Sequence, residues 1–251
     1  MLTSKRKQYL IDRLQRDGQL VAKAVCEELN VSEDTIRRDL REMAKEGLLL
    51  RVHGGALPAS PAMGDFAART HIAPEEKVAI GRAAARLVQE GQVVFVDGGT
   101  TSAQLVRHLA PGLKATVITH SPSIAVELVA HPGIDVIMLG GRLFRHSVVG
   151  VGAATIEAIG KVRADLYFMG VCSVHPTAGL STGDFEEAAV KRALCQAAAE
   201  TIVLASSEKL ATASPYQVVP LTEIAGMVVA GATPAALLAP YKQLGITLYP
   251  S

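Results

Sequence analysis

Two adjacent arginines near the N-terminus have the chemistry of a DNA contact. Arg37 and Arg38 lie in residues 31–40, VSEDTIRRDL. Ser32 is a suitable N-cap for a helix that begins there, and the two acidic residues after it favour the positive end of the helix dipole. A guanidinium can bond guanine through two N–H groups, and a hydroxyl can bond phosphate. The residues with this reach near the start of the helix are Ser32, Thr35, Arg37 and Arg38.

A second motif, DGGTT at residues 97–101, has the chemistry of an anion site. It follows the apolar run VVFVD and opens a helical stretch, so its glycines permit close backbone approach. Thr100, Thr101 and the free N–H groups of the helix start could hold a phosphate. The motif is neither a Walker loop nor the GxGxxG dinucleotide loop. By itself it could equally be a plain turn between a strand and a helix.

Other polar or glycine-rich segments follow later strands. They are Thr119-His120-Ser121, Gly140-Gly141-Arg142 and residues 170–173. Turn glycines and an N-capping Ser121 would explain each segment alone, but their convergence on one sheet edge is what a pocket requires. Glu187 and Lys191 lie four apart on one helical face, either in that pocket or as a surface ion pair. Lys209 follows the next strand.

The N-terminal elements that must position the arginines form a winged helix-turn-helix. Apolar spacing predicts helices over residues 4–16 and 21–29 and a third from Ser32 to about Lys45, with Ile36, Leu40 and Met43 facing inward. After Gly47, the alternating residues 48–52 predict a small β wing that carries Arg51. A solvated charged helix would explain an isolated arginine pair, but the three helices and the wing favour DNA binding.

The rest of the chain predicts a larger α/β domain. Residues 58–74, with three prolines and a glycine, form the expected linker between domains at 1–57 and 75–251. Short apolar runs alternate with helical stretches, which predicts a mostly parallel sheet whose ligand lies outside the carboxyl ends of the strands. The expected strands are 93–97, 116–119, 135–139, 165–171, 201–205 and 227–231, and the helical stretches are 75–90, 100–109, 121–131, 149–160 and 184–199.

Composition limits the alternatives. The net charge is +1, and residues 1–55 hold 11 Lys or Arg against 9 Asp or Glu, so the placement of the basic residues must carry any DNA argument. The three cysteines have no paired spacing, so neither a disulfide framework nor a metal site is expected, and no motif indicates a cofactor. No run reaches the about 18 apolar residues of a membrane helix. With no signal peptide, the expected location is the cytoplasm, without a membrane partner.

The sequence VSEDTIRRDLREMAKEGLLLRVHGGA resembles the signature of the DeoR family of bacterial transcription regulators, VS-x-x-TIRRDL followed by G-x-x-x-R-x-HGGA. The resemblance implies that Ser32, Thr35, Arg37 and Arg38 contact operator DNA. It also implies that Lys5 or Arg6, together with Arg51, contact phosphates.

Residues 75–231 resemble the sensor domain of the same family, which shares its fold with ribose-5-phosphate isomerase. The matching motifs are DGGTT, residues 119–121, the Gly140-Gly141 pair, residues 187–192 and residues 206–209. The resemblance implies a phosphorylated sugar or related metabolite as effector. Two departures are His120, where the family has Asn, and Ser206 with Glu208, where it has Asp and Ser. The effector-binding residues expected are Asp97, Gly99, Thr100, Thr101, Thr119, His120, Ser121, Gly141, Glu187, Lys191 and Lys209.

Together these features predict a DNA-binding regulator that responds to a phosphorylated metabolite. Repression of a carbohydrate or related catabolic operon is the commoner outcome in the family. One winged helix buries little surface, so we expect at least a dimer on two-fold related or repeated sites. The alternative is a sugar-phosphate isomerase with a DNA-binding appendage. However, residues 170–174 read GVCSV where such isomerases carry an acidic segment, so we expect no catalytic residues and no enzyme.

Overall fold

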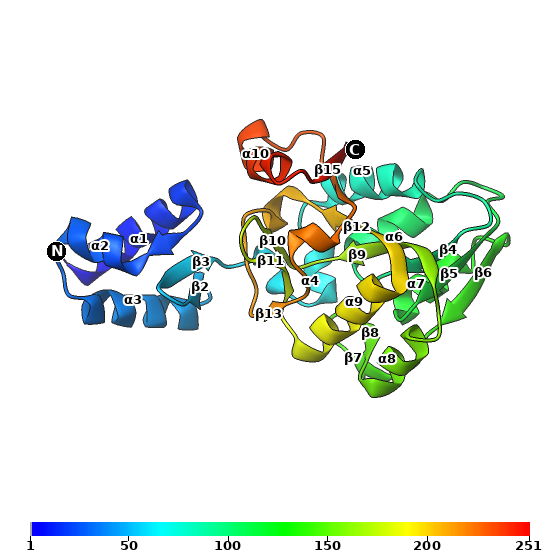
Figure 1. The fold of residues 1–251 in the computed structure, drawn as a ribbon, viewed down its shortest axis with the longest axis horizontal. Coiled ribbons are helices and arrows are strands. Elements are labelled where there is room, and N and C mark those ends of the chain that lie inside the picture. Colours follow the sequence, from blue (N-terminus) through cyan, green and yellow to red (C-terminus); the bar gives the residue numbers. More distant parts are fainter. Residues whose placement is uncertain (1) are drawn as a thin grey trace.

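The computed structural model describes residues 2–251 and shows a small N-terminal part joined to a larger one by a thin connection (Figure 1). The small part has three helices and a three-stranded antiparallel sheet of order β1-β3-β2. Its elements are α1 (Thr3–Asp17), β1 (Leu20–Val21), α2 (Ala22–Leu29), α3 (Glu33–Lys45), β2 (Leu49–Val52) and β3 (Gly55–Pro58).

Local sequence explains the ends of these helices. Gly18 ends α1 in the left-handed conformation at φ 71°, which glycine adopts without steric cost. Ser32 caps α3, because its Oγ accepts a hydrogen bond from the backbone N of Thr35 at 3.3 Å. Leu10, Ile36 and Met43 are fully buried between the helices. The winged helix-turn-helix expected from the sequence is therefore confirmed.

The larger part is built on a seven-stranded sheet of order β15-β14-β12-β9-β4-β5-β6, in which every neighbouring pair is parallel. The predicted α/β class is confirmed, and six of the seven strands were expected from apolar runs. The strands are β4 (Val93–Val96), β5 (Ala115–Thr119), β6 (Ile134–Met138), β9 (Ala164–Gly170), β12 (Ala198–Ala205), β14 (Gly226–Val229) and β15 (Thr247–Pro250).

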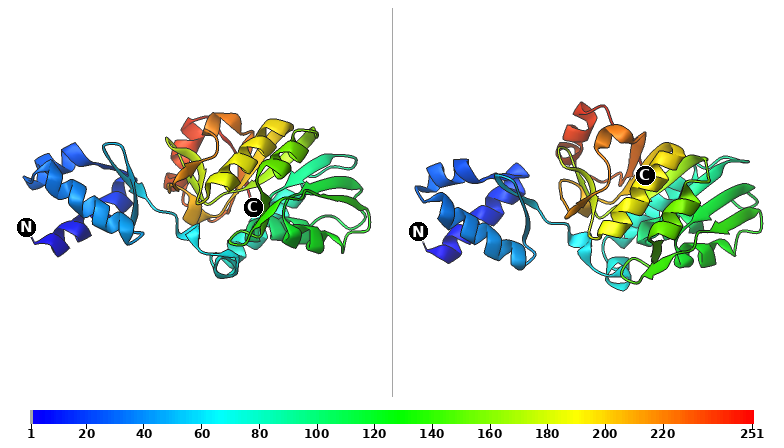
Figure 2. Two further views of the ribbon diagram at one scale, coloured as in Figure 1. Left: turned by 90° about the horizontal axis from the view of Figure 1, so that it is seen from below. Right: turned by 60° about the horizontal axis from the view of Figure 1, so that its bottom comes forward.

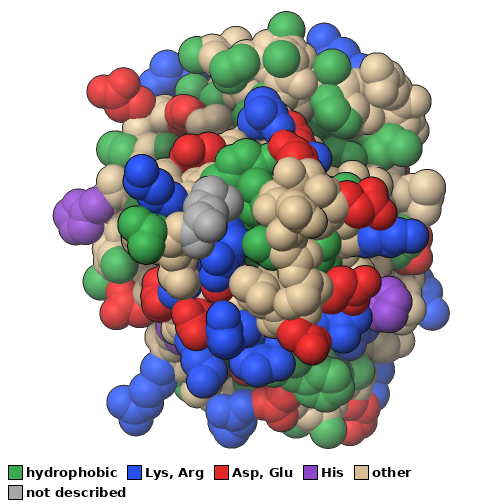
Figure 3. All heavy atoms as spheres, turned by 90° about the vertical axis from the view of Figure 1, so that its left-hand side faces the viewer, with side chains coloured by type: hydrophobic (Ala, Val, Ile, Leu, Met, Phe, Trp, Pro, Cys, Tyr) green, Lys and Arg blue, Asp and Glu red, His purple; other side chains and the backbone are tan. Residues whose placement is uncertain are grey.

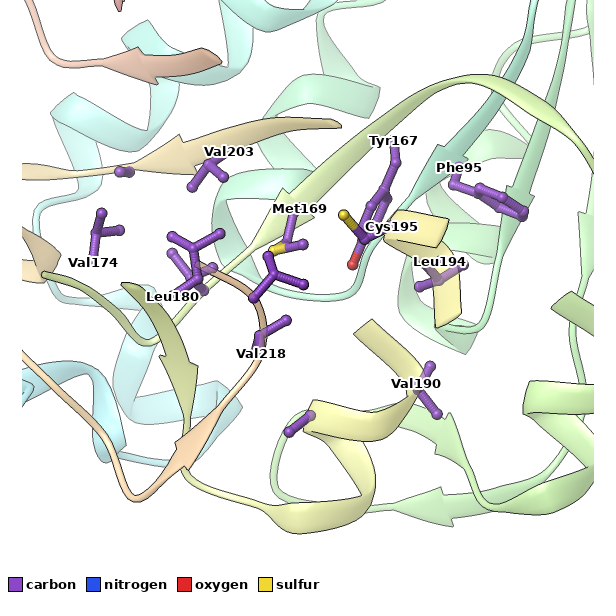
Figure 4. Close-up of a cluster of buried hydrophobic side chains, with 14 of the residues drawn as sticks. Phe95, Tyr167, Met169, Val174, Leu180, Val190, Leu194, Cys195, Val203 and Val218 are labelled. Carbon is purple, nitrogen blue, oxygen red and sulfur yellow. The ribbon is translucent and has the colours of Figure 1, made fainter. Parts of the chain in front are cut away.

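Helices cover both faces of this sheet (Figure 2). One face packs against α5 (Pro74–Ala85), α6 (Thr100–Arg107) and α7 (Pro122–Leu128), and the other against α8 (Ala153–Ile159), α9 (Phe185–Ala197) and α10 (Ala235–Gln243). Successive residues of β4 alternate between the two cores, because side chains of a strand point to opposite faces. Figure 4 shows one core, where the rings of Phe95 and Tyr167 meet edge to face at 6.3 Å between centroids.

The sheet reverses its strand order between β4 and β9. From β4 the chain proceeds outward through β5 to β6, and from β9 it proceeds in the opposite direction through β12 and β14 to β15. At such a switch point the carboxyl ends of the two central strands diverge into loops on either side. Residues 97–101 follow β4 and residues 171–172 follow β9, so these segments lie side by side.

Some elements differ from the expectation. The stretch 149–160 was expected to be helical, but its first residues form β8 (Val149–Val151), because valines favour a strand. This strand pairs with β7 (Arg142–Phe144). A second small sheet contains β10 (Ser173–His175), β11 (Gly179–Thr182) and β13 (Tyr216–Gln217). The expected linker includes a short 3₁₀ turn, η1 (Pro61–Met63), and a helix, α4 (Phe66–Thr70).

Candidate ligand cavity and nucleic-acid interface

A small cavity lies at the switch point of the sheet. Its walls come from the loops after β4, β9 and β12, from α9, and from the segment that joins the two parts of the chain. The lining residues are Ala62, Arg69, Ile72, Lys77, Gly98, Gly99, Thr100, Thr101, Ser102, Gly170, Val171, Cys172, Glu187, Lys191, Glu208 and Lys209. Of the residues expected from the sequence, the structure therefore brings together Gly99, Thr100, Thr101, Glu187, Lys191 and Lys209.

Polar atoms without partners concentrate in this cavity. Within residues 2–251, five buried side-chain nitrogen or oxygen atoms have no hydrogen-bond partner. Four of them belong to lining residues: Arg69 Nε, Thr101 Oγ1, Ser102 Oγ and Glu208 Oε2. Buried polar groups in proteins are nearly always hydrogen-bonded, so this cluster indicates a place for a ligand with complementary groups.

The charges of the cavity favour an anion. Four cationic side chains line it, against the two carboxylates of Glu187 and Glu208. Burial lowers the pKa of Lys209 to about 8, with Glu208 opposing the shift and Lys77 adding to it. Burial also lowers the pKa of Lys77, for which Glu208 again only partly compensates. The nearby carboxylates therefore do not fully offset the burial of either ammonium group, and a bound anion would supply the missing negative charge.

Asp97 does not line the cavity, contrary to the expectation that it meets the hydroxyl groups of a ligand. Its carboxylate is fully buried and accepts hydrogen bonds from Tyr167 Oη and Gly170 N, each at 3.0 Å, and from Lys191 Nζ. Burial alone would raise the pKa of Asp97, but the Lys191 ammonium and the His120 hydrogen bond outweigh it and hold the pKa below its usual range. Asp97 therefore positions the loop and Lys191.

His120 is also buried behind the cavity, which corrects its expected role as a direct ligand contact. Its Nε2 lies 2.8 Å from Asp97 Oδ1, and its Nδ1 lies 2.8 Å from the carbonyl oxygen of Gly150. An ionised carboxylate and a carbonyl oxygen can only accept hydrogen bonds. Both ring nitrogens of His120 therefore face hydrogen-bond acceptors. Together with Lys191, His120 contacts the buried carboxylate of Asp97.

Glu187 and Lys191 form a buried pair, so the alternative of a surface ion pair is wrong. Lys191 Nζ lies 3.4 Å from Glu187 Oε1 and donates to the carbonyl oxygen of Gly170 at 2.7 Å. Burial alone would lower the pKa of Lys191, but the adjacent carboxylates of Asp97 and Glu187 raise it. Thr182 Oγ1 donates to Glu187 Oε2 at 3.1 Å. Both side chains are thus held in fixed positions at the cavity wall.

Three further expected contacts lie away from the cavity, because their strands end on the other side of β4. Thr119 Oγ1 accepts from the backbone N of Ser121, and Ser121 Oγ donates to the carbonyl of Val148 at 2.8 Å instead of capping α7. Gly141 lies against α8, where a Cβ atom would come within 2.0 Å of Thr155 Oγ1. Ser121 thus contacts the turn between β7 and β8.

The sequence reasoning missed several lining residues. Arg69 lies on α4 and Lys77 on α5, before the first strand of the sheet, and neither belongs to a strand end. Ser102 directly follows the DGGTT motif, so its place in the first turn of α6 could have been found. Glu208 was noted only as a departure from the family pattern. For Arg69 and Lys77, no local pattern indicated the cavity.

The exposed side of α3 forms the candidate nucleic-acid interface. Ser32, Arg37 and Arg38 are exposed, whereas Thr35 is half-buried. Arg37 Nη2 donates to Glu33 Oε2 at 2.6 Å, which orients the guanidinium along the helix. A groove between α3 and the wing is also lined by Arg51 and by two basic residues that were not among the expected DNA contacts, Lys23 and Arg41. Figure 3 views this end of the molecule and shows basic side chains, mixed with acidic ones, below its centre.

Arg6 is not available to phosphate, which corrects one expected DNA contact. Its side chain is 6% exposed and forms an ion pair with Asp39, which is fully buried on α3. This pair joins α1 to α3, so Arg6 holds the helices together. Lys5 and Arg51 are exposed and can reach a phosphate backbone.

Other site types find no support in the part of the chain that the structure describes. No group of three or more His, Cys, Asp or Glu side chains there could hold a metal ion, and the three cysteines are free and buried. No helix among these residues is long and apolar enough to cross a membrane.

Comparison with known proteins places both parts of the chain. The DeoR-like helix-turn-helix domain matches residues 6–61, and the DeoR C-terminal sensor domain matches residues 72–230. The chain is 32% identical over 217 residues to the HTH-type transcriptional repressor GlcR of Bacillus subtilis, covering 86% of this chain and 83% of that protein. It is 29% identical over 210 residues to the glycerol-3-phosphate regulon repressor of Escherichia coli K12, covering 83% of each.

A solved structure also overlaps the larger part. Ribose 5-phosphate isomerase A from Methanocaldococcus jannaschii aligns with a TM-score of 0.40 and 20% identity, covering 54% of each chain.

Proposed function

The chain belongs to the DeoR family of DNA-binding transcription regulators, and on this premise we propose that it represses its target genes until a phosphorylated polyol or sugar occupies the sensor cavity. It is a regulator, not an enzyme, in line with its named relatives. Those relatives include the repressor of a glycerol-3-phosphate regulon.

One observation carries the effector proposal: the cavity contains both hydrogen-bond donors and a hydrogen-bond acceptor that have no hydrogen-bond partner among the described residues. Arg69 Nε offers an N–H group, and the hydroxyls of Thr101 and Ser102 can donate or accept. Glu208 Oε2 can only accept once the carboxyl is ionised. A phosphate would satisfy the donors, and a hydroxyl group on the same molecule would satisfy Glu208. A phosphorylated polyol or sugar carries both.

The expected pose follows from these groups. Phosphate lies against Gly99, Thr100 and Thr101 at the first turn of α6, where backbone N–H groups and the helix dipole favour an anion. Lys209 contributes the opposing charge. The hydroxyl groups face Glu208 and Glu187.

On the DNA side, α3 enters the major groove and presents Ser32, Thr35, Arg37 and Arg38, while Lys5 and Arg51 contact phosphates. A second copy of the chain binds a second half-site, since one winged helix alone buries too little surface for specific binding. Effector binding shifts the balance between DNA-competent and DNA-incompetent arrangements by its differential affinity for the two. A regulator of this kind acts where the DNA is, in the cytoplasm.

A thermal-shift titration tests the effector site. Inorganic phosphate, glycerol 3-phosphate, and pentose and hexose phosphates are added to the full-length protein, with the dephosphorylated compounds as controls. At a concentration about 100 times its Kd, a bound compound adds about 2.7 kcal/mol of stability. We expect stabilisation by phosphorylated compounds, and its loss in Lys209→Met with unchanged binding to operator DNA.

Two results would contradict this proposal. If dephosphorylated sugars stabilise the protein as well as the phosphorylated ones do, the cavity is not a phosphate site. If Lys209→Met abolishes operator binding, Lys209 has a structural role instead.

A further inference from the structure

The segment that joins the two parts of the chain lies against the cavity. Ser60 Oγ donates to the carbonyl oxygen of Cys172, a lining residue, and the backbone N of Ala213 donates to the carbonyl oxygen of Pro58 at 2.9 Å. Pro58 is the last residue of the wing strand β3. The chain therefore passes directly from the wing onto the wall of the cavity. The helix α4 begins eight residues after Pro58, at Phe66, with Asp65 as its N-cap.

Arg69 places a guanidinium from this segment at the cavity. Its Nε is buried and, among the described residues, finds no hydrogen-bond partner. Its Nη2 lies 3.4 Å from the carbonyl oxygen of His146, a distance near the limit of a hydrogen bond. Lys77 Nζ donates to the backbone carbonyl of Arg69 and so holds this part of the chain against α5. The guanidinium thus has an N–H group available for an anion.

The position of Arg69 in the chain differs from that of the other cationic lining residues. Lys77 lies on α5 and Lys191 on α9. Lys209 lies on η2 (Ser207–Lys209), which follows β12, whereas Arg69 lies on the connecting segment. A ligand shifts a conformational equilibrium only through contacts that differ between the two states. A contact between the ligand and these lysines adds affinity. A contact with Arg69 on α4 can also change how the connecting segment positions the wing strand β3.

We propose that Arg69 binds the phosphate of the effector and that this contact fixes α4 against the cavity, which transmits occupancy of the sensor domain to the wing strand. The proposal rests on the proposed function, because it takes the cavity to be the phosphate site. It adds a phosphate-binding residue and a physical route between the two domains: phosphate, Arg69, α4, the anchored residues 58–60, and β3.

Inorganic phosphate serves as the probe for a test on the full-length protein. Phosphate affinity is measured by thermal-shift titration at constant ionic strength, and amide hydrogen exchange of residues 66–72 is measured with and without saturating phosphate. We compare wild type with Arg69→Gln, with Arg69→Lys, which keeps the charge but loses the planar fork, and with Arg82→Gln. Arg82 is an exposed arginine on α5 that does not line the cavity, so it provides a matched control.

In wild type and Arg82→Gln, phosphate should slow exchange in residues 66–72. Arg69→Gln should bind phosphate about tenfold more weakly, as expected for the loss of a charge-assisted hydrogen bond, and should show no slowing even at saturation. Arg69→Lys should be intermediate, and all three variants should melt close to wild type without phosphate. The exchange of α1 to α3 provides an internal reference for global effects.

Each other outcome has a distinct meaning. Wild-type affinity and wild-type slowing in Arg69→Gln would overturn the assignment of Arg69. Weaker binding with undiminished slowing would overturn the route through α4. A wild-type protein that binds no phosphate would instead refute the proposed effector site.

Discussion

At Lys209, burial lowers the pKa of the ammonium group to about 8, and the charged groups around it act in both directions. Glu208 raises the pKa, as does Cys172 more weakly, whereas Lys77 and Arg69 lower it. In the empty cavity a growing fraction of Lys209 is therefore neutral above about pH 8. A bound anion favours the charged form, so binding of the anion and protonation of Lys209 support each other.

Effector affinity should consequently decrease as pH rises through about 8. A phosphate monoester is already mostly dianionic at pH 7, so the change reports the protein rather than the ligand. The decrease should approach about tenfold for each pH unit well above the pKa, because binding then requires uptake of one proton. Calorimetric titration with a phosphate monoester, glycerol 3-phosphate, between pH 7 and 9.5 measures it. Lys209→Met should bind more weakly with little pH dependence over this range, and a flat wild-type profile would exclude Lys209 as the titrating group.

The residues around Asp97 show how a polar strand end can be structural. Its pKa is held below the ordinary value by Lys191 and His120 despite its burial, so the carboxylate contributes stability that is present above about pH 4 and is lost as pH falls through the folded pKa. The departure from the family pattern at position 120 thus adds a ring that contacts Asp97 in this buried cluster. It does not place a new group in the cavity.

At the scale of elements, α3 has two faces of different character. Its inner face is anchored by Ile36, Leu40 and Met43, and by Asp39 paired to Arg6 of α1. Its outer face carries the exposed arginines. Removing one partner of a buried ion pair leaves an uncompensated charge, so changes at Arg6 affect DNA binding through the fold of the domain.

Arg38→Ala tests whether this outer face reads DNA sequence. We expect a loss of about 1 to 3 kcal/mol in binding to an operator selected from random DNA, with little change on scrambled DNA. Fluorescence anisotropy at fixed salt measures both, and Arg82→Ala in the sensor domain controls for the loss of one positive charge. An equal loss on scrambled DNA would reduce Arg38 to a phosphate contact.

At the scale of the whole molecule, one chain presents one recognition helix, and the sensor domain lies beyond a connection that continues directly from the wing (Figure 1). Specific recognition by such a small module is expected to require a second copy bound to a related half-site.

Half-site spacing tests this expectation. Two helices of a dimer meet the same side of DNA when half-sites lie a whole number of turns apart, about 10 to 10.5 base pairs each. Inserting five base pairs between the half-sites should therefore weaken binding by more than about tenfold, whereas inserting ten should restore part of it. Gel-shift titrations on the three fragments measure this. Equal affinity for all three would show that each chain binds independently.

The sequence by itself determined the class of the fold and most strands of the main sheet. Ser32 and Gly18 mark helix ends through local hydrogen bonding and backbone conformation, and the apolar runs of β4 and β9 indicate buried parallel strands, because these signals depend on residues close in the chain. The DGGTT motif similarly placed Thr100 and Thr101 at a helix start.

Only the tertiary structure decided which polar residues face the cavity. Asp97 and Thr101 lie in one motif, yet Asp97 is turned into the interior by Lys191, 94 residues away, while Thr101 lines the cavity. Arg69 reaches the site because the connecting segment folds back over strand ends from much later in the chain. Depth and proximity of this kind depend on how distant elements pack, and no local spacing of residues specifies them.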